Sequence, residues 1–363
     1  MWNKRWGQGN GENRADRRST GAGKVRRPVK ILIYSRTFNP AIGGMEKLQE
    51  VLAGEFQRQG HGVEVITETP GAADLPYRVH RQPGSLQFWR IARRADVILT
   101  APLSLKRLLP QALSLRPILV AQPDAMLGGK GLAQGLFAWL KRRVVGRVIS
   151  IVPSRYLAQY YRRSVVIANP YDPAVFHWPK DAGAPRRDIL FAGRIVRWKG
   201  VHVLVEAFAR IAVARPEVRL TIAGDGAQRG EVEAQVAALG LGERVTFTGI
   251  VRGEALGDLM RRHAVMVVPS VNEEPFGIVA LEGLACGCRM VVSEFGGLPE
   301  AVGDQALLFP PGDAGALAKR LGEALDAPVP ERVEVEGYLA RFAPARVAGQ
   351  YLEVFAGRCG KLW

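Results

Sequence analysis

The feature that most constrains the fold of this chain is an alternation of short apolar runs and helical patterns, which occurs in two separate series. The first series opens with an apolar run at 29–34, a loop containing Gly43 and Gly44, a helical pattern over 45–59 and an apolar run at 63–67. Further apolar runs follow at 96–100, 117–121 and 147–152. A strand, a glycine loop, a helix and a second strand are the opening of a doubly wound parallel sheet.

Residues 168–187 interrupt the alternation with a dense group of prolines, which is typical of a linker between domains. A second series of the same kind follows. Its strands are expected at 188–191, 218–223, 244–248, 264–269 and 289–292, and its helices at 201–214 and 228–239. The sequence therefore predicts an α/β protein with two doubly wound, Rossmann-like domains that face each other across a cleft.

The expected division of the chain has four parts. Residues 1–28 are rich in Gly, Asn, Arg and Lys and contain almost no aliphatic side chains, so we expect a disordered basic tail. Residues 29–170 form the first domain and residues 171–342 the second. A C-terminal helix over about 343–363 is expected to pack back on the first domain.

Composition narrows the class of protein. Hydrophobic residues make up 47% of the 363 residues, a globular value, and no run of 18 uncharged apolar residues is present to form a membrane span. The three cysteines, Cys286, Cys288 and Cys359, are an odd number, which favours a reducing, cytoplasmic compartment over a disulfide framework. No His or further Cys stands at metal-ligand spacing from Cys286 and Cys288, so we expect these two to be core residues.

The basic excess of the chain lies entirely in its first half. Residues 1–177 hold 28 Lys and Arg against 11 Asp and Glu, whereas residues 178–363 hold 22 against 23. This uneven distribution of charge suggests an anionic partner for the first half of the chain, such as a membrane surface, an anionic lipid or nucleic acid. The segment 132–148 places Leu, Phe and Trp beside Lys and Arg, as interfacial helices do, although a core helix with a solvated basic end fits equally well. The segment 103–110 is a second membrane candidate.

Two carboxylates, Glu274 and Glu282, stand eight positions apart around the sequence Pro-Phe-Gly-Ile-Val-Ala-Leu. Gly277 is expected to open a helix between them. The free N–H groups of a helix N-terminus attract anions, and carboxylates accept hydrogen bonds from vicinal hydroxyls. The pattern therefore indicates a pocket for a ligand that carries both hydroxyls and phosphate.

A second constellation, residues 193–200, reads Gly-Arg-Ile-Val-Arg-Trp-Lys-Gly. A strand is expected to end at Gly193 and a helix to begin after Gly200, with Arg194 and Lys199 in the turn. Two cations beside a helix N-terminus suit a diphosphate, because Arg can bind two oxygens and Lys is a compact point charge. A solvated charge cluster on a loop is the alternative.

These motifs closely resemble the Glu-x7-Glu region and the Gly-Arg-x5-Lys-Gly signature of retaining glycosyltransferase family 4, which has the GT-B fold. The resemblance is dense over residues 188–312 and thinner before them. It implies that the first domain binds the acceptor and the second a nucleotide-sugar donor. It also implies that Glu274 faces the donor sugar and Glu282 the nucleotide ribose, with catalysis carried by Arg194, Lys199 and Glu274. The remaining donor-binding residues that it implies are Gly43, Gly44, Gly193, Gly224, Ile250, Val251, Phe276, Gly277 and Ile278, with Ile250 and Val251 at the nucleobase.

The departures from the family lie in the first domain. Many relatives carry a His after the strand expected at 117–121, where this chain has Gln122-Pro-Asp124, and none of its five histidines takes that position. Gln122 and Asp124 are therefore the expected sugar contacts. A protein that binds a sugar nucleotide without transferring it is the alternative that this departure leaves open.

The resemblance implies a retaining hexosyltransferase that needs no metal or other cofactor, since cationic side chains offset the charge of the leaving diphosphate. The expected partners are a nucleotide-diphospho-sugar, a glycan or lipid-linked acceptor of cell-envelope polysaccharide synthesis, and an anionic membrane surface. The expected location is the cytoplasm, peripheral to the membrane. A nucleic-acid partner is not favoured, because the chain contains no recognisable nucleic-acid-binding module.

Overall fold

The structure is a computed structural model of the 363-residue chain, and it describes residues 27–40, 44–71, 74–101, 118–121, 149–161, 163–180, 186–272 and 274–359. For residues 118–121 it describes the backbone only. Several expectations lie outside these ranges: most of the basic tail, the segments 103–110 and 132–148, and the three site residues Gly43, Gln122 and Asp124.

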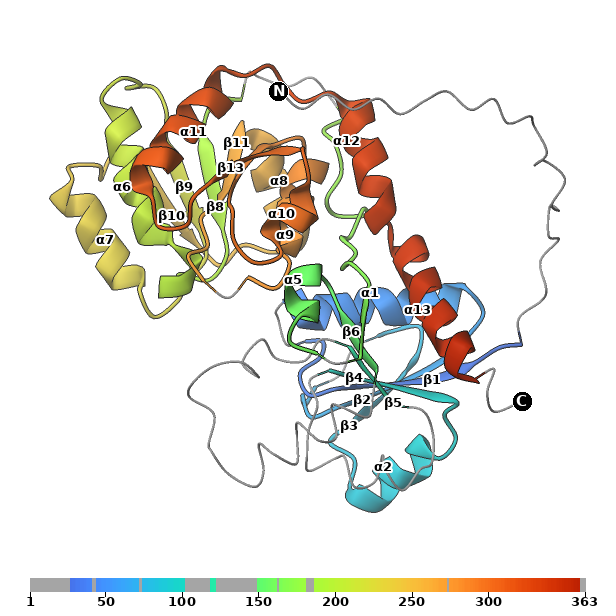
Figure 1. Cartoon of the computed structure of the whole chain (residues 1–363). Coiled ribbons are helices and arrows are strands. Elements are labelled where there is room, and N and C mark those ends of the chain that lie inside the picture. Colours follow the sequence, from blue (N-terminus) through green and yellow to red (C-terminus); the bar gives the residue numbers. More distant parts are fainter. Residues whose placement is uncertain are drawn as a thin grey trace, which may run out of the picture.

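The chain forms two lobes, each built on one parallel sheet (Figure 1). The first sheet has the order β3-β2-β1-β4-β5-β6-β7. Its strands are β1 (Lys30–Ser35), β2 (Gly62–Thr67), β3 (Arg78–Arg81), β4 (Val97–Ala101), β5 (Ile118–Ala121), β6 (Ile149–Val152) and β7 (Ser164–Val166). The direction of winding reverses between β1 and β4, which pair in register from Ile31 opposite Val97.

Helices cover both faces of this sheet because successive side chains of a strand point to opposite sides. Ile31 and Ile33 of β1 pack in a core with α1 (Gly44–Arg58) and the C-terminal α13 (Pro344–Cys359). Leu32 and Tyr34 pack on the other side in a smaller core with α2 (Ser85–Ala92). The last helix of the chain thus lies on the first lobe, where the rings of Tyr351 and Phe355 contact Phe56 of α1.

The second sheet has the order β10-β9-β8-β11-β12-β13, and its winding reverses between β8 and β11. Its strands are β8 (Ile189–Ala192), β9 (Leu220–Ala223), β10 (Val245–Gly249), β11 (Val265–Val268), β12 (Arg289–Ser293) and β13 (Ala306–Phe309). The strands β8, β11 and β12 are buried almost throughout, as parallel strands covered by helices on both faces must be.

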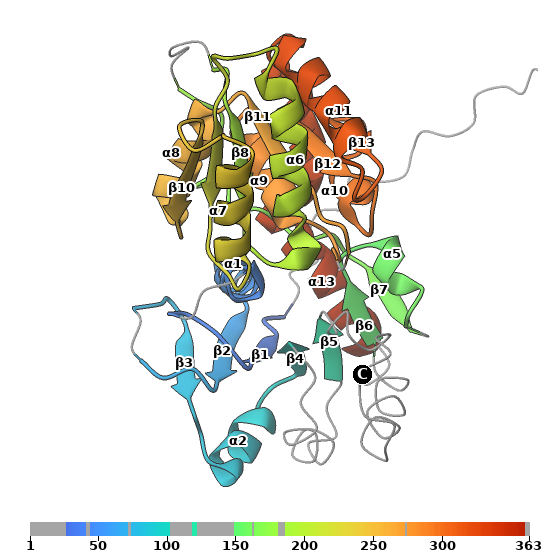
Figure 2. The same ribbon diagram turned by 90° about the vertical axis from the view of Figure 1, so that its left-hand side faces the viewer.

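Helices lie on both faces of the second sheet (Figure 2), and each face has its own hydrophobic core. One contains α6 (Val201–Ala212), α7 (Arg229–Ala238) and α11 (Ala314–Asp326). The other contains α8 (Gly253–Arg262), α9 (Ile278–Ala285), α10 (Leu298–Val302) and α12 (Arg332–Leu339). Cys286 and Cys288 belong to this second core, and burial raises the pKa of both thiols to about 12.

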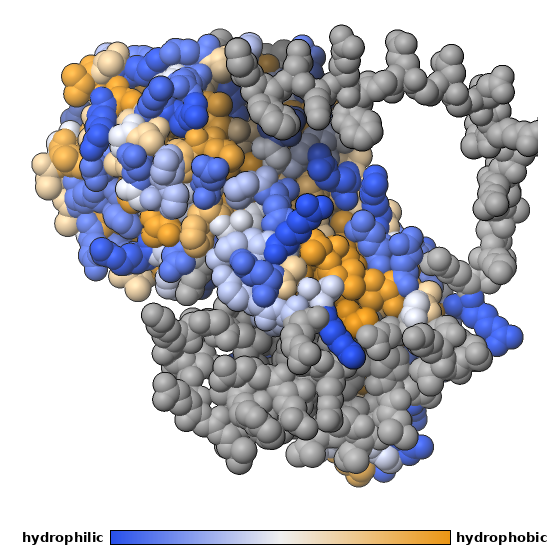
Figure 3. Space-filling view, in the orientation of Figure 1, coloured by the Kyte–Doolittle hydropathy of each residue, from blue (hydrophilic) through white to orange (hydrophobic). Residues whose placement is uncertain are grey.

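The GT-B-like pair of doubly wound sheets expected from the sequence is confirmed. Three strands were missed, and each lies at an edge of its sheet. β3 reads Arg-Val-His-Arg, β7 has only three residues, and β13 is a run of four apolar residues that is mostly half-buried. The surface of the second lobe mixes hydrophilic and apolar side chains (Figure 3), with ion pairs along its helices such as Arg210–Glu206 and Arg229–Glu233. Within the described ranges, no helix has both the length and the apolar character that crossing a bilayer requires.

Candidate active site

The functional residues predicted in the second domain gather at one edge of its sheet. Arg194 follows β8 and Glu274 follows β11, and these two strands are neighbours at the point where the winding of the sheet reverses. In doubly wound sheets, ligands bind outside the carboxyl ends of the strands at this reversal. The edge faces the first lobe, since the Ser154 hydroxyl donates a hydrogen bond to the carbonyl of Pro275 at 2.6 Å.

An ion pair forms the centre of the site. The Lys199 ammonium donates to a carboxylate oxygen of Glu274 at 2.5 Å, and the buried Ser270 hydroxyl donates to the same oxygen at 2.9 Å. The Glu274 side chain is buried, while Lys199 keeps about a fifth of its side chain in contact with solvent. The carboxylate therefore has a fixed orientation, with one of its two oxygens still able to accept bonds.

Arg194 lies on the same turn as Lys199 and is exposed. Its guanidinium lies over the ring of Trp198, 5.5 Å from the ring centroid, which holds it by a cation–π contact. Among the described residues it makes no ion pair, so its five N–H donors remain directed to solvent. Lys199 ends the short 3-10 helix η2 (Arg197–Lys199), and Gly200 then leads into α6.

Two glycines at this edge cannot carry a side chain. Gly224 has φ +152°, and a Cβ there would lie 1.8 Å from the carbonyl oxygen of Gly193. Gly277 has φ +95°, and a Cβ there would lie 2.4 Å from the Leu298 side chain. The ends of β8 and β9 and the turn into α9 therefore approach their neighbours more closely than any other residue would permit. The backbone N–H groups at the start of α9 lie beside this turn, whereas the Phe276 side chain is buried against Phe342.

Glu282 lies on α9, about one and a half turns after Gly277. Protein surrounds its carboxyl group although part of the side chain still reaches solvent, as happens in a hollow of the surface. This burial, and to a smaller degree the negative charge of Asp172, raises the pKa of Glu282 to about 7, against the opposing effect of Lys47. Glu282 is therefore sensitive to protonation near neutral pH.

Lys47 belongs to the first domain, and its charge acts on the carboxyl group of Glu282. It lies in the first turn of α1, just after Gly44, and its ammonium is 3.0 Å from the carboxylate of Asp172 in the segment between the domains. Lys47, Asp172 and Ser270 were not predicted from the sequence as members of the site. The position of Lys47, one turn after Gly43-Gly44, was the available signal.

Ile250 and Val251 follow β10 at the same edge, and 60% of the Ile250 side chain is exposed. The Gly224 N–H donates to the Gly249 carbonyl at 2.7 Å, which draws the ends of β9 and β10 together. Of the expected residues, the described structure thus places Gly193, Arg194, Lys199, Gly224, Ile250, Val251, Glu274, Phe276, Gly277, Ile278 and Glu282 along one edge of the second sheet.

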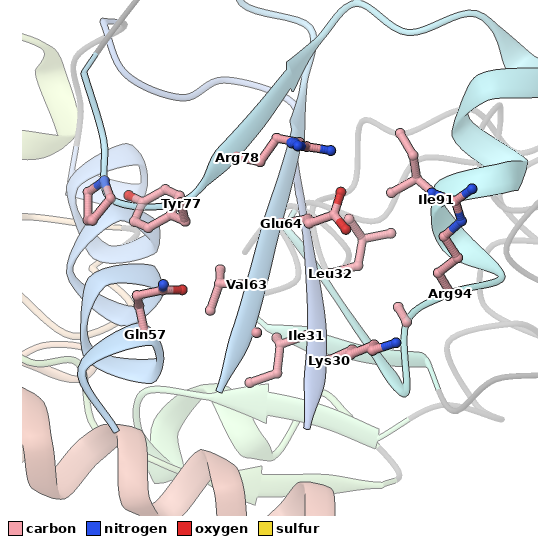
Figure 4. A pocket seen from close by; sticks show the side chains of 13 residues that line it. Lys30, Ile31, Leu32, Gln57, Val63, Glu64, Tyr77, Arg78, Ile91 and Arg94 are labelled. Carbon is pink, nitrogen blue, oxygen red and sulfur yellow. The ribbon is translucent and has the colours of Figure 1, made fainter. Parts of the chain in front are cut away.

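A pocket of about 350 Å³ lies elsewhere, at the amino ends of β1, β2 and β3 (Figure 4). Lys30, Glu64 and Arg78 are among its lining side chains, with Ile91 and Arg94 from the end of α2 and the turn that follows it. None of the predicted site residues lines it. Because amino and carboxyl ends of parallel strands lie at opposite edges, this pocket is separate from the site described above. Among the described residues, no three His, Cys, Asp or Glu side chains gather in a way that could hold a metal ion.

Comparison with known proteins agrees with this architecture. The chain is similar to the Anabaena protein HepE, whose crystal structure was determined in complex with UDP and glucose, with a TM-score of 0.73 and 21% identity over 91% of this chain and 100% of that one. The chain has the GT-B fold.

Sequence similarity is concentrated in the second half. Residues 176–339 match the family model described as glycosyl transferases group 1. A 2-deoxystreptamine glucosyltransferase of Streptomyces kanamyceticus is 35% identical over 162 residues, which are 44% of this chain and 41% of that protein. A glycogen synthase of Mycobacterium tuberculosis is 37% identical over 168 residues, 45% of this chain and 40% of that protein. The matched part thus spans less than half the length of either curated relative.

Proposed function

We propose that this protein is a glycosyltransferase that moves a hexosyl group from a nucleotide-diphospho-sugar to an acceptor bound by the first domain. The observation that carries the proposal is the cluster of Lys199, Glu274 and Arg194 at the carboxyl edge of the second sheet, with Glu282 on the helix that follows. Cations for phosphate and carboxylates for hydroxyls lie together where doubly wound sheets bind ligands.

Each part of a nucleotide sugar has a counterpart in this cluster. The free oxygen of the Glu274 carboxylate accepts from a sugar hydroxyl, and the Glu282 carboxylate accepts from the ribose. The Lys199 ammonium has three donors, so it can keep its bond to Glu274 and still bind a phosphate oxygen. Exposed Ile250 offers an apolar contact for the base. UDP-glucose is the first donor to test, because HepE was also solved in complex with it.

The proposed chemistry is electrostatic. As the bond between the sugar and the diphosphate breaks, negative charge grows on the leaving diphosphate, and Arg194 and Lys199 stabilise it without reorganisation. We propose that transfer proceeds with retention of anomeric configuration and without a metal ion, as the family resemblance implies.

We propose a glycan or lipid-linked acceptor of cell-envelope polysaccharide synthesis, bound at a cytoplasmic membrane face. The basic excess of residues 1–177 supports an anionic surface as partner. Within the described part of the first domain, α2 has suitable chemistry: Leu86 is 61% exposed, and the Arg93 guanidinium lies 4.5 Å from the centroid of the Trp89 ring. The segment 132–148, which lies outside the described residues, is the other anchor that we propose from its sequence.

A panel of nucleotide sugars tests the proposal. Purified protein is incubated with UDP-, GDP- and ADP-sugars, the melting temperature is measured, and release of the nucleoside diphosphate is followed. A ligand that binds only the folded state raises the melting temperature, by mass action. We expect one nucleotide class to raise it and to be consumed. Binding without consumption under any acceptor condition would favour the sugar-nucleotide-binding alternative that the Gln122-Pro-Asp124 sequence leaves open.

A further inference from the structure

The two domains are joined next to the site by a small set of hydrogen bonds. On the first domain, Ser154 precedes the short helix α5 (Arg155–Ala158) and caps it by accepting from the Leu157 N–H at 3.2 Å. On the second, Glu300 of α10 uses both carboxylate oxygens. One accepts from the Arg155 N–H at 2.8 Å and the other from the Tyr156 N–H at 2.9 Å. A side chain of one domain thus satisfies the first two free amides of a helix in the other.

Ser154 links this junction to the loop that carries Glu274. Its side chain is fully buried, and its hydroxyl donates to the Pro275 carbonyl at 2.6 Å. Pro275 directly follows Glu274, so the peptide next to the proposed sugar-binding carboxylate is bonded to the first domain. The bond is partly buried, and a carbonyl that loses its donor there is destabilised, so the bond resists rearrangement of the loop.

The other side of the same loop rests on the segment that leads into α10. The Gly297 N–H donates to the Glu274 carbonyl at 2.9 Å. A Cβ on Gly296 would lie 2.2 Å from that carbonyl oxygen, and a Cβ on Gly297 would lie 2.2 Å from the Pro275 oxygen. The ring of Phe295, in the same segment, packs against Tyr156 at 5.8 Å between centroids. The loop is therefore held between the α10 segment and the first domain.

We infer that Ser154 and Glu300 are positioning residues that set the place of the Glu274 carboxylate relative to the first domain. The inference rests on the proposed function, in which Glu274 binds the donor sugar and the acceptor arrives from the first domain. Ser154 acts on the loop through the Pro275 carbonyl. Glu300 acts on the turn that presents Ser154, because its two charged hydrogen bonds fix the start of α5.

The test uses Ser154→Ala, which removes the bond to Pro275, and Glu300→Gln, which leaves one acceptor oxygen where the carboxylate has two. Asp313→Asn is the matched control, since Asp313 also accepts from a backbone N–H at a helix start, that of Ala316 at 2.8 Å, in α11 away from the junction. Ser154→Thr keeps the hydroxyl and serves as the rescue variant.

Two measurements are made on the full chain. The first is hydrogen exchange of the Gly297 and Ala280 amides, which donate to the carbonyls of Glu274 and Gly277 and so report opening of the loop. The second is steady-state transfer with UDP-glucose, together with the Kd for UDP. In both junction variants we expect these amides to exchange about tenfold faster, as expected for one lost hydrogen bond. We expect kcat to fall about 10- to 100-fold from misplacement of the sugar-binding group, with the Kd for UDP within about twofold.

The control variant should match the wild type in both measurements, and Ser154→Thr should restore kcat. Unchanged exchange in Ser154→Ala, or faster exchange with unchanged kcat, would overturn the inference. A general loss of folding is recognised separately, because it would weaken UDP binding and speed exchange throughout the second domain. If the wild type neither binds nor consumes a nucleotide sugar, the proposed function fails, while the exchange measurement still decides whether Ser154 and Glu300 hold the loop.

Discussion

Replacing Glu282 by Gln should make the protein more stable and a poorer binder of nucleotide. The substitution keeps the shape of the side chain, removes its charge and replaces one of its two acceptor oxygens by an NH2 donor. Burial is the main reason that the pKa of this carboxyl rises from 4.5 to about 7, and the negative charge of Asp172 adds to it. The ionised form of Glu282 therefore lowers the free energy of unfolding, and the uncharged Gln side chain removes this destabilisation.

The sign and size of the effect follow from the two pKa values. At a pH below 4.5, Glu282 is protonated in both folded and unfolded chains and adds no cost. Between pH 4.5 and about 7, the unfolded chain loses its proton while the folded chain keeps it, so the free energy of unfolding decreases as pH rises. Above pH 7 the accumulated cost is constant, at about 3 kcal/mol by the conversion of about 1.4 kcal/mol per pH unit.

Urea unfolding of wild type and Glu282→Gln at pH 5, 6, 7 and 8 measures this difference. We expect a gap that is small at pH 5 and grows to about 3 kcal/mol in favour of the variant at pH 8. In a Lys47→Met background the gap should keep growing to a higher pH and reach a larger final value, because the Lys47 ammonium lowers the pKa of Glu282 in the folded state. Glu217→Gln, an exposed site, is the control. A gap independent of pH, or one that favours the wild type at pH 8, would refute the reasoning.

Four further results are expected. Arg194→Ala should lower kcat for transfer about 10²- to 10³-fold, the usual loss for one preorganised charge partner. The melting temperature should stay near that of the wild type, because the side chain is exposed. Wild-type turnover would remove Arg194 from the diphosphate site. In calorimetry with the free nucleoside diphosphate, Glu282→Ala should lose affinity and Glu274→Ala should keep it while losing transfer, and the reverse pattern would invert the proposed orientation of the donor. Gly224→Ala should destabilise the second domain by about 3 kcal/mol or more in urea unfolding, since the new Cβ would overlap a backbone oxygen. Gly230→Ala, on the open surface of a helix, should instead stabilise it by about 1 kcal/mol. Equal effects of the two substitutions would contradict the close approach of β8 and β9. The wild type should sediment with anionic but not neutral liposomes and be released by salt, within the range set by the Debye length, and binding insensitive to lipid charge would rule out an electrostatic anchor.

The strands that the sequence predicted well are those whose burial is uniform. β8, β11 and β12 are apolar because helices cover both faces of the sheet, so each reads as a continuous apolar run. β3, β7 and β13 are edge strands of three or four residues, and runs this short do not establish a period even where, as in β13, every residue is apolar. Local patterning thus shows the interior of a sheet better than its edges.

The residues proposed for the site could be named from the sequence, whereas the contacts between them could not. Lys199 and Glu274 were assigned separately to the diphosphate and the sugar, and their ion pair was not foreseen. They are 75 positions apart, and only the crossover that makes β8 and β11 neighbours brings them together. Likewise, the Lys47–Asp172 pair depends on how the domains are placed relative to each other, which no local pattern encodes.

We expect the carboxyl edge of the second sheet to bind a nucleotide-diphospho-sugar through Lys199. Calorimetric titration of the wild type and of Lys199→Ala with UDP-glucose, GDP-mannose and ADP-glucose tests it most directly. The account predicts that one of these binds the wild type and that Lys199→Ala weakens its binding at least about tenfold, since a charge-assisted hydrogen bond contributes about 1.5–3 kcal/mol. Equal affinity of the two proteins for that nucleotide sugar would contradict the account.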